Sequence, residues 1–125
     1  MKLQDFDFRI WNTACKKYID DVGLISNIMC DLIHSATDII GDFEIELWTG
    51  IYDKNGKKIY EGDIVKTKSP YDCFLAKISI HKEGTFYFEG KNGDYIGSLI
   101  YLVEDEGYTI ETIGNIHENP ELLKC

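Results

Sequence analysis

Alternating apolar and polar positions predict strands along most of the chain. Phe6, Phe8 and Ile10 alternate with polar residues before Trp11, a period of two that buries one face of a strand. Residues 17–19 are predicted as its hairpin partner. Turns rich in glycine, asparagine and aspartate separate further predicted strands over 43–48, 59–60, 64–68, 76–81, 86–88, 99–103 and 108–116.

Two segments carry a different pattern. Between Leu24 and Ile40, apolar residues recur at the three-to-four spacing of an amphipathic helix. The isoleucines and Cys30 of this stretch also suit a strand, so helix and strand both stay open. At the C-terminal end, Asn119 and Pro120 predict one short helical turn over residues 119–123, with Asn119 as its N-cap.

Short strands joined by tight corners predict a mainly β fold. We expect a small antiparallel, partly closed SH3-like barrel, because closure protects strand edges. This β-barrel-like module with its C-terminal turn is placed at residues 43–125. Residues 1–42 are expected to form an N-terminal hairpin lobe and a packed segment, with at most one short helix, that does not fold independently. The apolar run Leu99–Val103 predicts a strand covered on both faces.

The excess of acidic over basic residues determines which classes of partner we expect. The chain has 22 acidic and 13 basic residues, a formal net charge of -9, and its lysines and arginines do not cluster along the sequence. Binding a nucleic-acid backbone requires clustered positive charge, so direct nucleic-acid binding is not expected. An acidic surface could instead imitate nucleic acid and occupy a basic partner. At 44% hydrophobic residues, the composition predicts a folded core.

Candidate chemistry is sparse. The cysteines Cys15, Cys30, Cys73 and Cys125 form no CxxC pair, so we expect neither a zinc site nor a redox motif. The first residues lack the pattern of an export signal, and no apolar run approaches the roughly 20 residues of a membrane span. We therefore expect reduced thiols, a cytoplasmic location and no membrane association.

Catalytic and cofactor motifs are also missing. The sequence contains no GxSxG nucleophile turn and no glycine-rich phosphate loop, and we expect no enzymatic activity, cofactor or small-molecule substrate. Adjacent acids at 20–21 and 104–106 are interpreted as solvated corners. The candidate residues for contact with a partner are the aromatic side chains Trp48, Tyr52, Tyr60 and Tyr87. Packing in the core is the alternative role for these rings.

Three segments carry a family resemblance. Phe8-Arg9-Ile10-Trp11, the segment from Thr49 to Val65 and the segment from Ile113 to Leu123 follow in an order and spacing similar to those of the YopX-type proteins of bacteriophages and prophages. The resemblance implies a small β-rich protein encoded by mobile genomes of low-GC Gram-positive bacteria and their relatives, with no family-wide activity established. It also implies an extended chain over residues 24–40.

The chain departs from this family at three places. Asn12 stands where the family commonly has an acid, Leu47-Trp48 replaces a Gln-Tyr pair, and His117 stands where Tyr is frequent. The shared residues are mainly turn formers and apolar strand positions, which favours a structural role for the motifs over an active site.

Two functional hypotheses follow from the sequence. The first is an accessory protein of a phage or prophage that binds a host or phage protein, or a second copy of itself. The alternative is an acidic mimic of DNA, or an accessory factor in phage nucleic-acid metabolism.

Overall fold

The computed structural model describes residues 2, 5–33, 43–90 and 92–123. The chain forms two compact units: an N-terminal unit, Asp7–Leu47, and a barrel unit, Met1–Phe6 with Trp48–Cys125. The boundary between them falls within strand β3, Phe43–Tyr52. That the two units unfold together stays a prediction.

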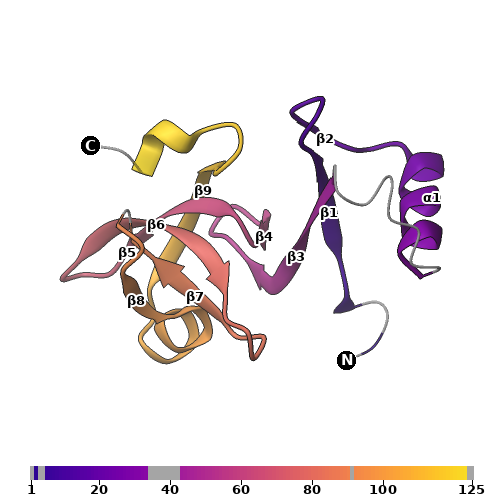
Figure 1. The fold of residues 1–125 in the computed structure, drawn as a ribbon. Helices are drawn as coiled ribbons and strands as arrows, with labels where there is room; N and C mark the ends of the chain where they lie inside the picture. The colour runs from indigo at the N-terminus through magenta and orange to yellow at the C-terminus, as the bar shows by residue number, and fades with distance from the viewer. Residues whose placement is uncertain (1, 3–4, 34–42, 91, 124–125) are drawn as a thin grey trace. The chain divides into compact units, whose positions relative to one another are not determined.

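The N-terminal unit contains the predicted hairpin and one helix. Strand β1 (Phe8–Asn12) pairs antiparallel with β2 (Lys17–Tyr18) and with the first half of β3 (Figure 1). Helix α1 spans Val22–Ile33. Asp21 caps it, because its carboxylate accepts the amides of Gly23 at 2.8 Å and Leu24 at 3.2 Å.

The helix decides between the two alternatives left open by the sequence. Residues 24–33 are helical, so the extended chain implied by the family resemblance is wrong for this part. Residues 34–40 lie outside the described residues. The three-to-four apolar spacing, together with an N-cap at Asp21, outweighed the strand propensity of the isoleucines.

The barrel unit is a curled antiparallel sheet. In the described part of the chain, its strand order is β8-β7-β6-β5-β9, and β4 pairs with the second half of β3 (Figure 1). The mainly β, partly closed architecture predicted from the turn spacing is confirmed. The strand bounds are β4 Lys58–Tyr60, β5 Asp63–Lys68, β6 Cys73–Ile80, β7 Phe86–Glu89, β8 Tyr95–Ser98 and β9 Thr109–Asn115.

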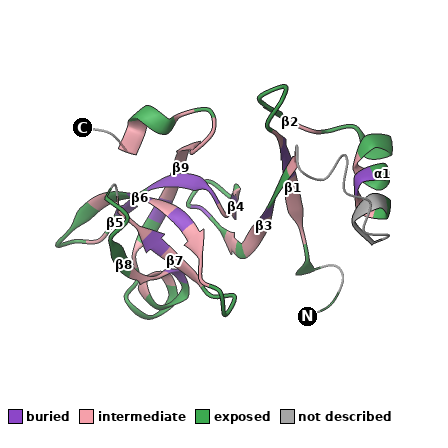
Figure 2. Cartoon of the chain, in the orientation of Figure 1, coloured by how far each residue is buried: buried purple, intermediate pink, exposed green. Residues whose placement is uncertain are grey.

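The core of this unit lies inside the curl. Alternate positions of neighbouring strands point inward, and Figure 2 shows buried stretches on β5, β6 and β7. Because residues two apart share one face of a strand, the inward positions meet in a single cluster. Its buried members are Ile59, Val65, Ala76, Ile78, Phe88, Leu99 and Ile110.

The predicted strand at Leu99–Val103 is wrong. Tyr101–Asp105 forms one turn of π-helix, closed by a hydrogen bond from the Glu106 amide to the Tyr101 carbonyl at 3.1 Å. Leu99 is buried, and Leu102 and Val103 pack against the core. A short apolar run fits a buried strand and a helical turn equally well. Here the apolar side of the turn, with Leu102 and Val103, covers one end of the core.

The strand that the sequence analysis missed lies just before this turn. Strand β8 pairs with β7 through Phe88 and Gly97. A Cβ at Gly97 would lie 2.9 Å from the Leu102 side chain, so glycine lets the helical turn approach the sheet. Gly97 weakens the sequence pattern of a strand at β8, and it is also the residue that permits this packing.

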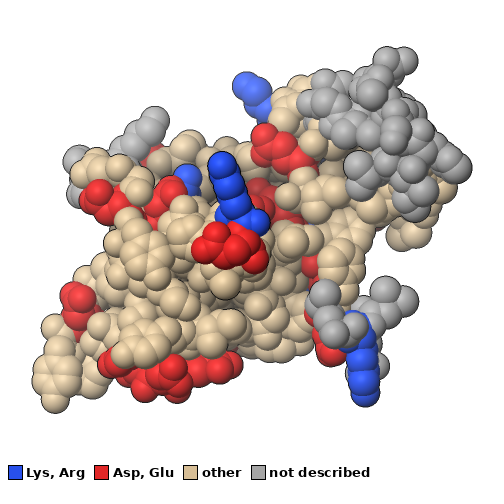
Figure 3. Space-filling view, turned by 60° about the horizontal axis from the view of Figure 1, so that its bottom comes forward, with Lys and Arg blue, Asp and Glu red and all other residues tan. Residues whose placement is uncertain are grey.

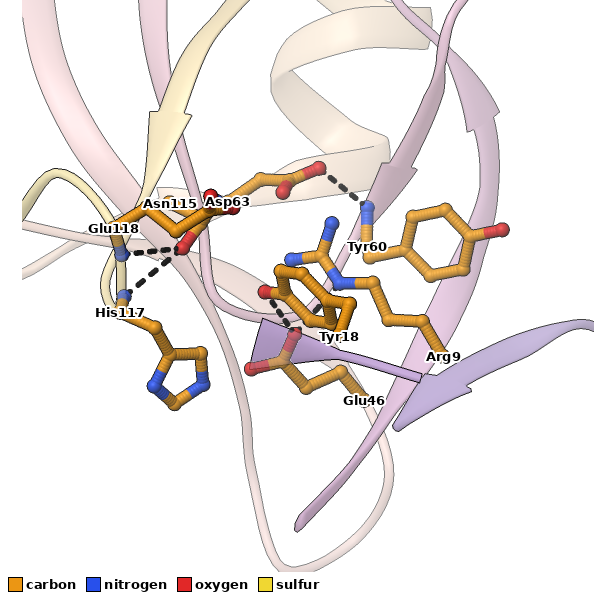
Figure 4. A network of polar contacts seen from close by, with 8 residues as sticks. All are labelled: Arg9, Tyr18, Glu46, Tyr60, Asp63, Asn115, His117 and Glu118. Atoms are coloured by element: carbon orange, nitrogen blue, oxygen red, sulfur yellow. Dashed lines mark hydrogen bonds and ion pairs between the residues drawn. The ribbon is translucent and has the colours of Figure 1, made fainter. Parts of the chain in front are cut away.

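Polar side chains hold the corners of the barrel unit. The Asp63 carboxylate accepts the Tyr60 amide at 2.8 Å, and Asn115 Oδ1 accepts the amides of His117 at 3.0 Å and Glu118 at 2.9 Å (Figure 4). These bonds satisfy backbone donors where the chain leaves the sheet. They explain why the family motifs are rich in turn-forming residues.

The predicted C-terminal turn is present as the 3-10 helix η4, Pro120–Leu123. The Asn119 side-chain oxygen, expected to cap this helix, accepts the Asn115 amide at 3.3 Å. The side chain thus folds back over Gly114 and secures the end of β9.

We expect Gly114→Ala to lower the free energy of unfolding by about 1–3 kcal/mol, the usual cost of overpacking. A Cβ at Gly114 would lie 2.6 Å from Asn119 Oδ1. Gly90→Ala is the matched control, because its Cβ would meet no atom closer than 3.5 Å, and it should change stability by less than about 0.5 kcal/mol. Urea denaturation measures both, and equal stabilities would contradict the packing argument.

Candidate interaction surface

Three of the four predicted contact residues lie on the β3–β4 ribbon. Trp48 pairs in register with Tyr60, and its ring meets Tyr52 edge-on with centroids 5.4 Å apart. The Trp48 indole Nε1 donates to the Ile51 carbonyl at 3.2 Å, and the Lys58 ammonium lies 4.5 Å from the ring centroid. Trp48 is therefore held by its own ribbon, whereas Tyr52 is 53% exposed.

Tyr87 belongs to a separate aromatic cluster on β7. Its ring stacks on His81 with centroids 4.1 Å apart, and the Tyr95 ring lies 5.4 Å away. The Tyr87 hydroxyl donates to Glu89 at 3.0 Å, and Glu89 is ion-paired with Lys77 at 2.8 Å. Burial and the Glu89 contact raise the pKa of Tyr87, so the phenol remains a neutral donor. The structure thus divides the predicted contact set into two groups.

An apolar groove of about 380 Å³ opens on the barrel unit, and none of the four predicted aromatic residues lines it. It forms where β6 extends beyond β7, since β6 begins at Cys73 but its register with β7 begins at Lys77. The volume is in the range of sites that hold ligands or partner side chains. Its walls come from β6, the β7–β8 turn, β8 and the C-terminal turn: Phe74, Leu75, Gly90, Asn92, Asp94, Ile96, Leu122 and Leu123.

The groove combines exposed apolar walls with an acidic edge. Leu75 and Ile96 are each 39% exposed, and of the described residues that line the groove Asp94 alone carries a charge. The chain as a whole carries a net charge of -9, and the face shown in Figure 3 has acidic groups at several places and few basic ones. The groove therefore suits a ligand that joins an apolar side chain to a positive charge.

The buried carboxylate of Asp53 is bonded to the backbone. It accepts the amides of Asn55 and Lys57 at 2.9 Å each and that of Thr112 at 3.1 Å. Burial opposes ionisation, but these bonds and the nearby Lys57 charge outweigh it and lower the pKa of Asp53. The carboxylate fixes the 53–56 turn against β9, and this role leaves it poorly suited to proton transfer.

A second polar network ties the small sheet of the N-terminal unit. Arg9 Nε donates to Glu46 Oε1 at 2.6 Å, and the Tyr18 hydroxyl donates to the same oxygen at 2.9 Å (Figure 4). The Arg9 guanidinium also lies 4.7 Å from the Tyr18 ring centroid. These contacts join β1, β2 and β3, so this cluster has a structural role.

The structure also shows where the cysteines and the adjacent acids at 104–106 lie. Cys15, Cys30 and Cys73 are free, exposed thiols, and Cys125 lies outside the described residues. The acids at 104–106 are exposed, as expected for a solvated corner. In the described part of the chain, no helix is long and apolar enough to cross a membrane.

The groove residues were missed by the sequence analysis, although one signal pointed to them. Outward positions of β6 include Lys77 and Ser79, which pair with Glu89 and Tyr87 on the same face. Leu75 is an apolar residue at the same phase. An apolar side chain at a solvent position of an otherwise regular strand is the pattern that could have indicated a binding surface.

Comparisons with known proteins place the chain among related folds. A family model described as YopX protein matches residues 7–124, which confirms the resemblance seen in the sequence. The crystal structure of protein EF1440 from Enterococcus faecalis is similar over 95% of this chain and 98% of that chain, with 26% sequence identity and a TM-score of 0.57. No curated protein matches the chain.

We expect Asp53→Asn to destabilise the protein by about 1.5–3 kcal/mol, because a carboxylate that accepts backbone amides is replaced by a neutral group with one acceptor. The exposed Asp94→Asn is the matched control. Since folding lowers the pKa of Asp53, its contribution is complete above the unfolded value of about 3.9 and is lost as pH falls through the lower folded value.

The measurement is urea denaturation of both variants and the wild type between pH 7 and pH 2. The stability difference between wild type and Asp53→Asn should be constant above about pH 5 and shrink below pH 4. A difference that grows as the pH falls would contradict this assignment.

Proposed function

This chain belongs to the YopX protein family, and we propose that it is a phage- or prophage-encoded accessory protein that acts by binding another protein and not by catalysis. The groove lined by Phe74, Leu75 and Ile96 is the observation that carries the proposal. Soluble domains expose few contiguous apolar concavities unless a partner covers them.

The proposed occupant is an extended segment of a basic partner. An apolar side chain of that segment enters the groove, and a neighbouring lysine or arginine faces Asp94. Charge complementarity supports this choice, because the chain carries a net charge of -9 and opposite charge accelerates encounter and excludes acidic competitors. A second copy of the same chain would also carry a net charge of -9, and this general repulsion disfavours self-association at the groove.

The polar centres of the protein support a binding role. The carboxylates of Asp53 and Asp63 accept backbone amides, and Glu46 accepts Arg9 and Tyr18. A catalytic acid or base needs access to substrate and a pKa near the working pH. These groups instead hold strands and turns in place.

The test is selection from a randomised peptide library displayed on a carrier phage, with the purified protein as bait. We expect the enriched peptides to share an apolar residue next to lysine or arginine. Leu75→Ser/Ile96→Ser should weaken binding of a selected peptide at least tenfold, because both groove walls lose apolar surface. Asp94→Lys should also weaken binding of the peptide. This loss of affinity should grow as the ionic strength is lowered, because the repulsion between the new lysine and the basic peptide is then less screened.

Tyr71→Ser is the matched control, since Tyr71 is fully exposed on a loop and does not line the groove; its affinity should stay within twofold of wild type. Enrichment of acidic peptides, or equal affinity for the groove variant, would overturn the proposal. A dimer in light scattering that Leu75→Ser/Ile96→Ser abolishes would assign the groove to a second copy instead.

A further inference from the structure

Strand β6 directs its backbone groups alternately to its two edges. Ile78 faces β5, because its carbonyl accepts the amide of Gly62, the residue before β5, at 2.8 Å. His81 faces β7, because its amide donates at 2.9 Å to the carbonyl of Thr85, the residue before β7. In an antiparallel sheet the amide and carbonyl of one residue point to the same edge, and those of the next residue point to the other. The amide and carbonyl of Leu75 therefore point to the β7 edge.

Strand β7 ends before it reaches Leu75. Over the described residues its register with β6 begins at the pair of Lys77 and Glu89. From Gly90 the chain turns back, since the Gly90 amide donates to the Asp94 carbonyl at 2.8 Å. In the part of the chain that the structure describes, β7 thus leaves the backbone of Leu75 unpaired at this edge, beside the groove that the Leu75 side chain lines.

Strand β9, an edge strand of the same sheet, shows how open backbone groups are covered elsewhere. Its Thr112 amide donates to Asp53 Oδ2 at 3.1 Å. Its Ile110 carbonyl accepts the Lys54 amide at 2.8 Å. Proteins protect strand edges in such ways because an open edge pairs readily with another extended chain. The contrast identifies the Leu75 position as the place on β6 where an extended chain can be added.

The exposed backbone groups determine what can fill the groove. An occupant that covers Leu75 removes its amide and carbonyl from water, and a buried backbone group without a partner is costly. An extended peptide supplies both a donor and an acceptor at the required spacing, whereas a purely apolar ligand supplies neither. Asp94 in the groove wall and the net charge of -9 favour a basic peptide over a second copy of this chain.

We propose that the basic partner segment binds by strand addition to β6: it continues the sheet where β7 ends, and one of its residues exchanges two backbone hydrogen bonds with Leu75. This inference rests on the proposed function, because it uses the same groove and the same class of partner. Cross-strand neighbours share a face of the sheet. The side chain of the pairing residue therefore lies beside Leu75, and the two adjacent side chains lie on the face of Phe74.

The first test is hydrogen exchange of ¹⁵N-labelled protein, with and without a saturating amount of a library-selected basic peptide. We expect exchange of the Leu75 amide to slow at least tenfold in the complex, because this amide becomes a donor to the peptide. The Lys82 amide, in the exposed turn between β6 and β7, is the matched control and should change by less than twofold. Unchanged exchange at Leu75 would overturn strand addition.

The second test uses a series of peptides that each carry one main-chain N-methyl group, which removes one donor and keeps every side chain. Methylation of the residue opposite Leu75 should weaken binding at least tenfold, because the Leu75 carbonyl loses its donor. Methylation of either adjacent residue should change the affinity by less than threefold, because those amides point away from β6. Leu75→Ala should bind more weakly but keep the same sensitive position, since it retains the backbone groups. Equal losses at adjacent positions would contradict pairing with β6.

These outcomes separate the binding mode from the proposed function. Peptides that lose affinity on Leu75→Ser/Ile96→Ser, but show neither slowed exchange at Leu75 nor a methylation-sensitive position, would overturn strand addition and leave the proposed function standing. A selection that yields no peptide dependent on the groove would overturn the proposed function, and strand addition with it.

Discussion

The pairing of β5 on both of its edges is the constraint on which the barrel unit depends. Strand β5 bonds to β6 on one side and to β9 on the other, and its inward residues Val65 and Thr67 are fully buried. A strand bonded along both edges cannot shift its register without exposing the core. Strand β6, which contributes Phe74 and Leu75 to the groove, is bonded to β5 along one edge.

Turn chemistry explains why the family motifs have the residues they have. Gly56 adopts a positive φ of 80°, Asp53 binds the amides of its own turn and of Thr112, and Asn115 binds the amides that follow β9. Gly56 permits a backbone conformation that other residues rarely adopt, whereas Asp53 and Asn115 accept backbone amides that an apolar side chain would leave unsatisfied. A motif of this kind preserves a fold, and the proposed groove lies largely outside it, since of its described lining residues Leu122 and Leu123 alone belong to a motif segment.

That Trp48, Tyr52, Tyr60 and Tyr87 contact a partner stays a prediction, and the structure shows how differently these rings are held. Trp48 was a candidate because large rings often contact partners, yet its indole donates within its own ribbon and its face is covered by Lys58. Tyr87 stacks on His81 and bonds to Glu89. None of the four rings lines the proposed groove. The groove instead consists of residues whose exposure depends on where β6 extends beyond β7, and this offset is set by the register between the strands.

The sequence by itself determined most of the strands, the corners and the mainly β architecture, because period-two alternation and turn residues act over a few neighbouring positions. It missed β8 and wrongly predicted a strand at Leu99–Val103. It left α1 as one of two alternatives, through the apolar spacing, and the cap at Asp21 was recognised only in the structure. Tertiary structure decided that residues 101–105 form a helical turn, which brings the Leu102 side chain close to Gly97. It also decided which side chains come together: Leu75 and Leu122 line one groove although they lie far apart in the sequence. Such meetings depend on register and packing between strands, which no local stretch of sequence specifies.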